Sequence, residues 1–185
     1  MNYQEYSAIF DDILSKKYLP APYDKETYFN YTKLSITRMR RWNKQLVLSN
    51  ALVEVVKAID KKQRWIIITE PWCGDAAHII PFIIKLAAHN NLINYDIQLR
   101  DSEPFLIENY LTAGKKSIPK LMVRDGNEND LFFWGPRPKP AQILVDELKT
   151  VNADAELQKI TLQNWYNADK GVSFCNELLA LYNAL

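Results

Sequence analysis

The chain has 185 residues, of which 48% are hydrophobic and 24% are charged, a balance that is typical of a globular protein and excludes disorder throughout. Its length suits one domain that can bury a core without stabilising disulfides. The formal net charge of +1 comes from 23 basic and 22 acidic side chains, so we expect neither nucleic acid nor a membrane surface as a partner.

The compartment is predicted from the N-terminus, the apolar runs and the cysteines. The first residues carry acids early and lack a basic segment followed by an apolar core, so we expect no signal peptide. The longest apolar stretches, at 65–69 and 79–86, are too short to span a bilayer. Cys73 and Cys175 lie far apart and do not form the pattern of a disulfide framework. These features predict a soluble protein of the reducing cytoplasm.

The first third of the chain is predicted to be helical. Apolar side chains at helical spacing predict helices over residues 3–17, 24–44 and 44–62. A break at Pro20 and Pro22 separates the first two helices. In the second helix we expect Leu34, Met39 and Trp42 to pack against the core.

The pattern changes after residue 63. Residues 65–69 form a continuous run of β-branched and aromatic side chains, which is typical of a strand buried on both faces. The elements predicted after it are a helix over 75–89, a strand over 95–99, a helix over 103–113, strands over 120–124 and 131–134, and helices over 139–149, 154–168 and 172–184. The turn at 125–127 suits an antiparallel hairpin. This order predicts an α/β sandwich with a mixed central sheet flanked by helices.

A specific motif follows the first predicted strand. Trp72, Cys73 and Gly74 stand between that strand and a helix, in the segment ITEPWCGDAAHIIPFI. Three later features accompany it: Pro81, Ile118-Pro119 and Gly135. The set resembles the thioredoxin-like superfamily, in which a Trp-Cys-Gly turn opens a helix that is kinked by proline. In that family an Ile-cis-Pro loop faces the turn, and a glycine often follows the hairpin.

The resemblance covers roughly residues 63–150. It implies a thioredoxin-like fold with that segment as the core. The whole chain, including the Trp-Gly-Pro-Arg-Pro stretch at 134–138, looks like a bacterial branch of the thioredoxin family with a Trp-Cys-Gly-Asp-Ala monothiol motif. We expect residues 1–62 to form a helical N-terminal extension packed on the core and residues 151–185 to form a C-terminal one, all within one globular domain.

Cys73 is the candidate nucleophile. Its thiol would lie at a helix N-terminus, where free N–H groups and the helix dipole favour the thiolate. Such positions can lower a cysteine pKa from about 8.5 towards roughly 3.5–7.5. Asp75 has opposite effects, because it stabilises the helix start but disfavours a nearby thiolate. The residues alone therefore leave the direction of the pKa shift open, and an inert packing cysteine is the alternative.

The neighbouring residues would form the substrate groove. Trp72 would supply a flat apolar wall beside the sulfur, and Gly74 would allow a partner backbone to approach. The predicted substrate-binding residues are Trp72, Gly74, Asp75, Ile118 and Pro119.

The motif departs from that of a dithiol thioredoxin. Ala76 occupies the position three residues after Cys73, so the turn has no second thiol to release a mixed disulfide. Ile67 stands where thioredoxins commonly bury an acid, and Glu70 is the nearest acid before the turn.

Three interpretations remain open. In the favoured one, the protein is a monothiol oxidoreductase: Cys73 attacks a disulfide-containing protein or a small-thiol mixed disulfide, and an external thiol resolves the product. It would need no bound cofactor, only a low-molecular-weight thiol as co-substrate. In the second, the groove between Trp72 and Ile118-Pro119 binds a peptide or protein without catalysis. In the third, Cys175 resolves Cys73, although its apolar neighbours predict a buried core position.

Other candidates carry weaker patterns. We expect His78 and His89 to face solvent, and we expect no metal site, because ligands of the right type do not cluster. A cluster shared between subunits, as in some monothiol glutaredoxins, lacks the Cys-Gly-Phe-Ser pattern here. Lys115, Lys116 and Arg137 could attract an anionic thiol such as glutathione, or could simply be solvated loop charges.

Overall fold

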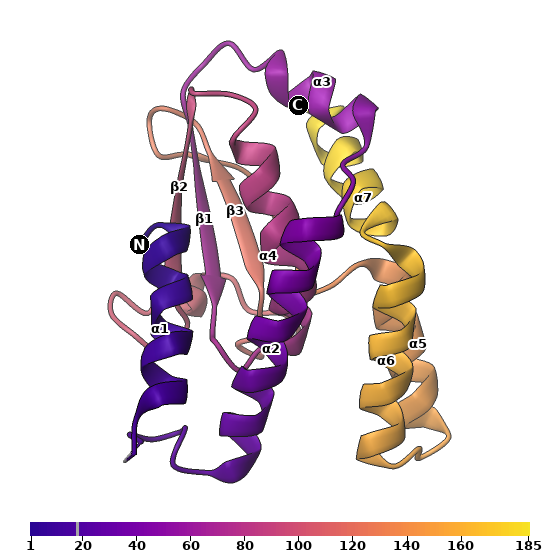
Figure 1. Cartoon of the computed structure of the whole chain (residues 1–185). Helices are drawn as coiled ribbons and strands as arrows, with labels where there is room; N and C mark the ends of the chain where they lie inside the picture. Colours follow the sequence, from indigo (N-terminus) through magenta and orange to yellow (C-terminus); the bar gives the residue numbers. More distant parts are fainter. Residues whose placement is uncertain (18) are drawn as a thin grey trace.

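The computed structural model describes residues 1–17 and 19–185 (Figure 1). The helices are α1 (Tyr3–Ser15), α2 (Glu26–Gln45), α3 (Asn50–Lys57), α4 (Gly74–Ala87), α5 (Lys139–Thr150), α6 (Ala155–Asp169) and α7 (Val172–Tyr182), with a 3-10 helix, η1, at Leu106–Asn109. The strands are β1 (Gln63–Thr69), β2 (Ile93–Leu99), β3 (Lys120–Arg124) and β4 (Asp130–Trp134).

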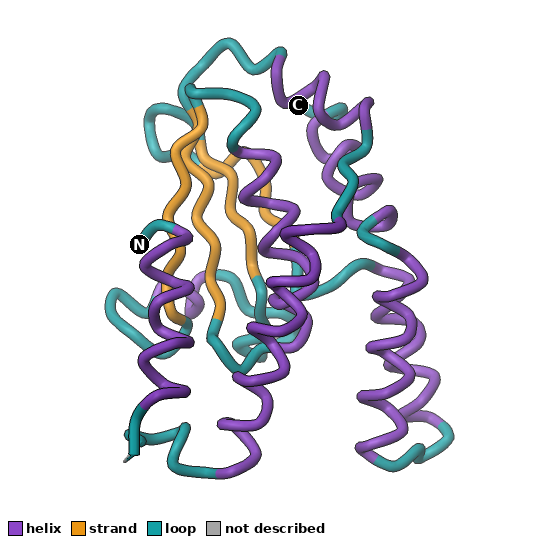
Figure 2. Tube along the Cα trace, in the orientation of Figure 1, coloured by secondary structure: helices purple, strands orange, loops and turns teal. Residues whose placement is uncertain are grey.

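The strands form one mixed sheet in the order β2-β1-β3-β4 (Figure 2). β1 runs parallel to β2 and antiparallel to β3, and β4 pairs antiparallel with β3. Successive residues of a strand point to opposite faces of the sheet, and the residues of β1 from Trp65 to Ile68 are all at most 1% exposed. Both faces of this central strand are therefore covered. The predicted α/β sandwich with a mixed sheet is confirmed.

Helix α4 is the central helix of the fold. It contacts β2 and α2, and it is buried along most of its length. On α7, Phe174 packs against Phe82 of α4 and Trp134 of β4, with ring centroids 6.3 and 4.9 Å apart. Helices α5 and α6 pack against each other as a hairpin beyond the sheet (Figure 1). The α5–α6 hairpin therefore adds a pair of helices beside the sheet and the helices that pack directly on it.

The N-terminal helix is fastened to the edge of the sheet. Asn2 and Glu5 form a capping box at the start of α1. The backbone of Met1 both accepts a hydrogen bond from the amide of Ile97 and donates to its carbonyl, and the Met1 amino group pairs with Asp96. These contacts hold the first residue of the chain against β2.

Two predicted helices differ from the structure. The predicted helix over 44–62 is wrong, because Leu46 adopts an extended conformation that ends α2, and α3 is a separate helix of eight residues. The helix over 103–113 is also wrong, since only η1 forms there. Phe105 has a φ of 54°, in the left-handed region that a helix cannot include, and Tyr110 leaves the helical region again.

One predicted packing residue is exposed. Met39 and Trp42 are buried as expected, but Leu34 is 49% exposed. No helix in the described part of the chain combines the length and apolar character needed to cross a membrane.

Candidate active site

Cys73 is the N-cap residue of α4. Its backbone N–H donates to the Glu70 carbonyl at 3.0 Å, closing the turn after β1. Its Sγ accepts a hydrogen bond from the Ala76 N–H at 3.4 Å and donates to the Ile118 carbonyl at 3.5 Å. The residue is 6% exposed. The motif thus places the thiol at a helix N-terminus, next to the loop before β3.

The pKa of Cys73 is raised to about 12. Burial is the largest cause, because it disfavours the charged thiolate, and the nearby Asp75 carboxylate adds to it. The N–H groups of Ala76 and Asp75, and the charge of Arg137, act in the opposite direction but are outweighed. The direction of the Cys73 pKa shift, which the sequence left open, is therefore upward, and the thiol is protonated in the resting site.

Asp75 joins three segments of the chain. Its Oδ2 accepts a hydrogen bond from Arg137 Nη2 at 2.8 Å, and its Oδ1 accepts one from the Tyr166 hydroxyl at 2.6 Å. The carboxylate is 11% exposed. Burial raises the pKa of Asp75, while Arg137 and Tyr166 oppose that rise. Asp75 therefore ties the start of α4 to the segment after β4 and to α6.

His78 is buried, and the prediction that it faces solvent is wrong. The residue is 3% exposed, and its ring stacks on Tyr166 with centroids 4.3 Å apart. Nδ1 accepts a hydrogen bond from Trp42 Nε1 at 2.8 Å, so Nε2 carries the proton and donates to Gln163 Oε1 at 3.1 Å. Burial lowers the pKa of His78 to about 3, which keeps the ring neutral. Because α2 and α6 cover the outer face of α4, the pattern of α4 alone could not reveal this.

A cavity of about 970 Å³ opens beside Cys73. Of the predicted site residues, those that line it are Trp72, Cys73, Gly74, Asp75 and Ile118. Pro119 is buried behind them and does not line the cavity, although its peptide bond with Ile118 is cis. The remaining lining residues come from α2, from α6 and from the loop before Ile118, together with His78, Arg100 and Arg137. The cavity is therefore larger than the groove predicted between Trp72 and Ile118-Pro119.

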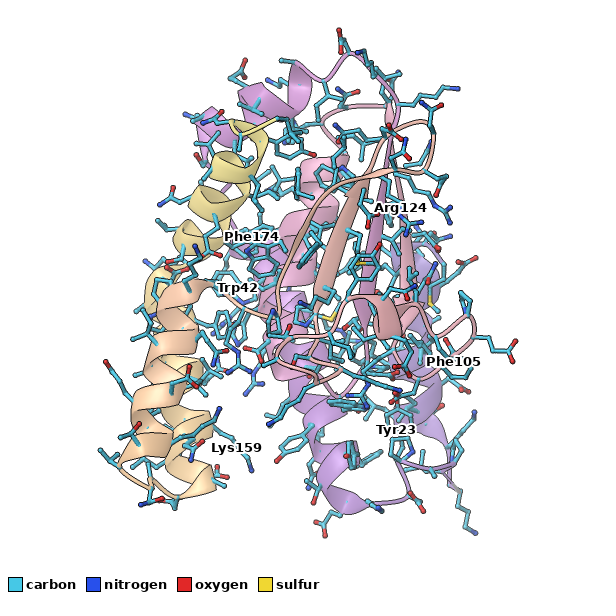
Figure 3. The ribbon with its side chains drawn as sticks, turned by 180° about the vertical axis from the view of Figure 1, so that it is seen from behind. Tyr23, Trp42, Phe105, Arg124, Lys159 and Phe174 are labelled. Atoms are coloured by element: carbon cyan, nitrogen blue, oxygen red, sulfur yellow. The ribbon has the colours of Figure 1, made fainter. Side chains whose placement is uncertain are left out.

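The cavity is bordered by more cations than acids. The cationic lining residues are Arg38, Arg100, Lys115, Lys116, Arg137 and Lys159, and the acidic ones are Asp75 and Glu156. Arg100 lies over the Trp72 ring, 4.8 Å from its centroid. Lys159 projects from α6 (Figure 3), and its Nζ lies 5.1 Å from the Tyr31 ring on α2.

Sequence reasoning identified Lys115, Lys116 and Arg137 but missed the other three cations. Those three come from α2, from the residue after β2 and from α6, which are far apart along the chain. The one available signal was that Arg38 lies four residues before Trp42 and therefore on the same helix face.

Cys175 is separate from this site. It is 2% exposed on α7, as its apolar neighbours predicted, and it does not line the cavity. Burial raises the pKa of its thiol. The structure therefore gives no support to a resolving role for Cys175.

Comparisons with known proteins support the fold and show the family. The chain is similar to two solved structures, an HIV epitope-scaffold and a protein of unknown function from Pseudomonas aeruginosa. Each is 17% identical to it, with TM-scores of 0.55 and 0.56, and the matches cover 100% of this chain and 99% and 98% of those chains. No curated protein matches the sequence. A family model described as thioredoxin matches residues 21–149, from before α2 to the end of α5. The chain has a thioredoxin-like fold and belongs to the thioredoxin family.

Proposed function

We propose that this protein is a monothiol thiol-disulfide oxidoreductase that uses Cys73 as its nucleophile. One observation carries the proposal: the Cys73 sulfur borders the cavity at the start of α4, with the Ala76 N–H directed at it. An N–H at this position stabilises negative charge on sulfur as it develops. Among the described residues, no other thiol lines the cavity.

The proposed reaction needs a disulfide and an external thiol. In the first step the Cys73 sulfur attacks one sulfur of the substrate disulfide. A new S–S bond forms, the old one breaks, and the leaving sulfur departs as a thiol with the proton that Cys73 loses. In the second step a low-molecular-weight thiol attacks the mixed disulfide, regenerates the Cys73 thiol and leaves in a disulfide with the substrate fragment. The low-molecular-weight thiol is oxidised, and the first leaving sulfur is reduced.

The raised pKa shapes this reaction. Only the thiolate attacks, so a pKa of about 12 makes the resting thiol slow towards any reagent. A disulfide that the cavity holds against the sulfur offsets this slowness through its high effective concentration. The proposal therefore expects a faster reaction with disulfides that bind the cavity walls formed by Trp72 and Ile118 than with small alkylating reagents. A reducing cytoplasm would supply the external thiol.

A second candidate function is binding without catalysis. The observation that favours it is the same buried, protonated Cys73. In this alternative the cavity between α2 and α6 holds a peptide or a partner protein, and Cys73 supplies only packing and a weak hydrogen bond.

Mixed-disulfide formation separates the two functions. The Cys73→Ser and Cys175→Ser proteins would each be incubated with glutathione disulfide near neutral pH and followed by intact mass. We expect one glutathione adduct on the Cys175→Ser protein, released by reduced glutathione, and none on the Cys73→Ser protein. A folded Cys175→Ser protein that forms no adduct would favour the binding function, and equal adducts on both proteins would refute the assignment of Cys73.

A further inference from the structure

Arg38 is the most unusual charge in the cavity. It lies on α2, is only partly exposed, and lines the cavity beside the start of α4. Its Nη1 is 3.3 Å from the point where a Cβ on Gly74 would lie, one residue after Cys73. Burial lowers the pKa of Arg38, so the folded protein holds this charge in an environment that disfavours it.

Within the described part of the chain no group compensates this charge by direct contact, although the Asp75 carboxylate favours it from nearby. In the described part of the chain, the Arg38 guanidinium makes no hydrogen bond or ion pair. The nearby Asp75 carboxylate is already bonded to Arg137 and Tyr166. The like charge of nearby Arg41 lowers the pKa of Arg38 further. A partly buried guanidinium of this kind is suited to a ligand carboxylate, which it can bind through two parallel hydrogen bonds.

The other cations around the cavity are mostly neutralised at its rim. Lys116 pairs with Glu108, Lys159 with Glu156, and Arg100 with Asp101. Arg137 pairs with Asp75, although its Nε is buried without a hydrogen-bond partner among the residues that the structure describes. Among the described residues, the lining cations without an acidic partner are therefore Arg38, which is partly buried next to Cys73, and Lys115, which is exposed in the loop before Ile118.

We propose that Arg38 forms a carboxylate subsite for the substrate of Cys73, and that this substrate is a low-molecular-weight thiol or disulfide that carries carboxylate groups. The inference rests on the proposed function and names its substrate class. The volume fits, because small-molecule sites are usually about 300–1,000 Å³ and this cavity has about 970 Å³. The subsite would hold the carboxylate while the substrate sulfur lies at Cys73.

Three small disulfides of different charge test the subsite in the Cys175→Ser background. They are dithiodipropionate, which is anionic, hydroxyethyl disulfide, which is neutral, and cystamine, which is cationic. The rate of adduct formation on Cys73 would be divided by the rate of the same disulfide with N-acetylcysteine, which removes differences in intrinsic reactivity. We expect the corrected rate for dithiodipropionate to exceed that for hydroxyethyl disulfide about tenfold, the effect of one charge-assisted hydrogen bond, and cystamine to be slowest.

Substitution at Arg38 should remove this preference selectively. Arg38→Gln should lower the ratio of the corrected rate for dithiodipropionate to that for hydroxyethyl disulfide about tenfold. Arg40→Gln is the matched control, because Arg40 lies on the same helix, is exposed, and pairs with Asp11 outside the cavity. Equal corrected rates for the three disulfides, or an equal loss in the Arg38 and Arg40 variants, would overturn the subsite while the proposed function stands.

A binding measurement separates failure of the subsite from failure of the proposed function. The Cys73→Ser protein would be titrated with S-methylglutathione and with its diethyl ester, neither of which can exchange disulfides. We expect S-methylglutathione to bind more tightly than the ester, and Arg38→Gln to abolish the difference. If Cys73 reacts with none of the disulfides, the proposed function fails, and this titration alone decides the subsite. Absence of binding at millimolar ligand, or equal binding in the Arg38 variant, would refute it.

Discussion

The Tyr166 hydroxyl donates a 2.6 Å hydrogen bond to Oδ1 of Asp75, two residues after Cys73 in the first turn of α4. The two residues are 91 positions apart in the sequence. Tyr166 also stacks on His78, so one tyrosine of α6 contacts α4 at two successive turns. The α5–α6 hairpin therefore contributes to the site, because it holds the acid whose charge raises the pKa of the Cys73 thiol.

Replacing Asp75 should lower the pKa of Cys73. In the Cys175→Ser protein we expect alkylation of Cys73 by iodoacetamide to have a midpoint above the ordinary value of 9.0, because burial and Asp75 both disfavour the thiolate. Asp75→Asn removes the like charge and should lower the midpoint by about one unit. The modified peptide would be quantified by mass spectrometry.

The control for this measurement is Asp146→Asn, which removes an exposed acid on α5. Its midpoint should equal that of the parent protein. A midpoint near or below 9.0 before any change at Asp75 would contradict the raised pKa. An equal shift in both variants would show that the effect is not local to the site.

Arg137 and Asp75 should be coupled in stability. Arg137→Met leaves the Asp75 carboxylate buried without its charged partner, with only the Tyr166 hydrogen bond remaining, so we expect a loss of about 2–3 kcal/mol in the free energy of unfolding. Adding Asp75→Asn should recover part of that loss, because the unpaired charge is removed. Urea denaturation of both single variants and the double variant gives the coupling energy, and strict additivity would contradict a direct interaction.

His78 should make stability depend on pH. The pKa of His78 is about 3 in the folded protein, against an ordinary value of 6.5. Between these two pH values the unfolded chain therefore binds a proton at this histidine and the folded chain does not. Stability from the neutral ring is therefore present above pH 6.5 and falls towards pH 3, by at most about 1.4 kcal/mol per unit. Arg38 and Arg41 also disfavour the charged ring. Asp75 has the opposite effect on stability. Its pKa is raised in the folded protein, so its contribution to the free energy of unfolding falls as the pH rises through that pKa.

A comparison of two histidine variants isolates this effect. His78→Gln should flatten the slope of unfolding free energy against pH between about 6.5 and 5, measured by urea denaturation. His89→Gln changes an exposed histidine after α4 and should keep the slope of the original protein. Identical slopes for the original protein and His78→Gln would show that His78 does not titrate as proposed.

Gly135 should not tolerate a side chain. Its φ is 119°, and a Cβ there would lie 2.2 Å from the Pro119 carbonyl oxygen, so backbone would have to move next to Ile118. We expect Gly135→Ala to reduce the free energy of unfolding by at least about 3 kcal/mol. Gly114→Ala is the matched control, because Gly114 also has a positive φ, of 72°, but no atom lies within 4 Å of the added Cβ. Its loss should be near 1 kcal/mol, within the range for a left-handed backbone alone. Equal losses in thermal unfolding would contradict the steric argument.

Much of the fold could be predicted because its signals are local. The buried run at 65–69, the turn at Cys73 and the strand at 120–124 depend on residues that are adjacent in sequence, and each lies where the pattern placed it. The predicted helix over 103–113 failed because Phe105 takes a left-handed conformation that apolar periodicity does not encode. The predicted helix over 44–62 failed because Leu48 and Leu52 keep helical spacing although Leu48 lies in the break between α2 and α3.

The sequence by itself determined the thioredoxin-like core and the position of Cys73 at a helix start, since strand, turn and helix follow one another along the chain. Only the tertiary structure decided the environment of the thiol. Asp75 meets Arg137 and Tyr166 across 62 and 91 positions, and Arg38 reaches the cavity from a helix outside the motif. Burial is the largest cause of the Cys73 pKa shift and depends on every element that packs around the sulfur, so the direction of that shift followed only from the folded chain.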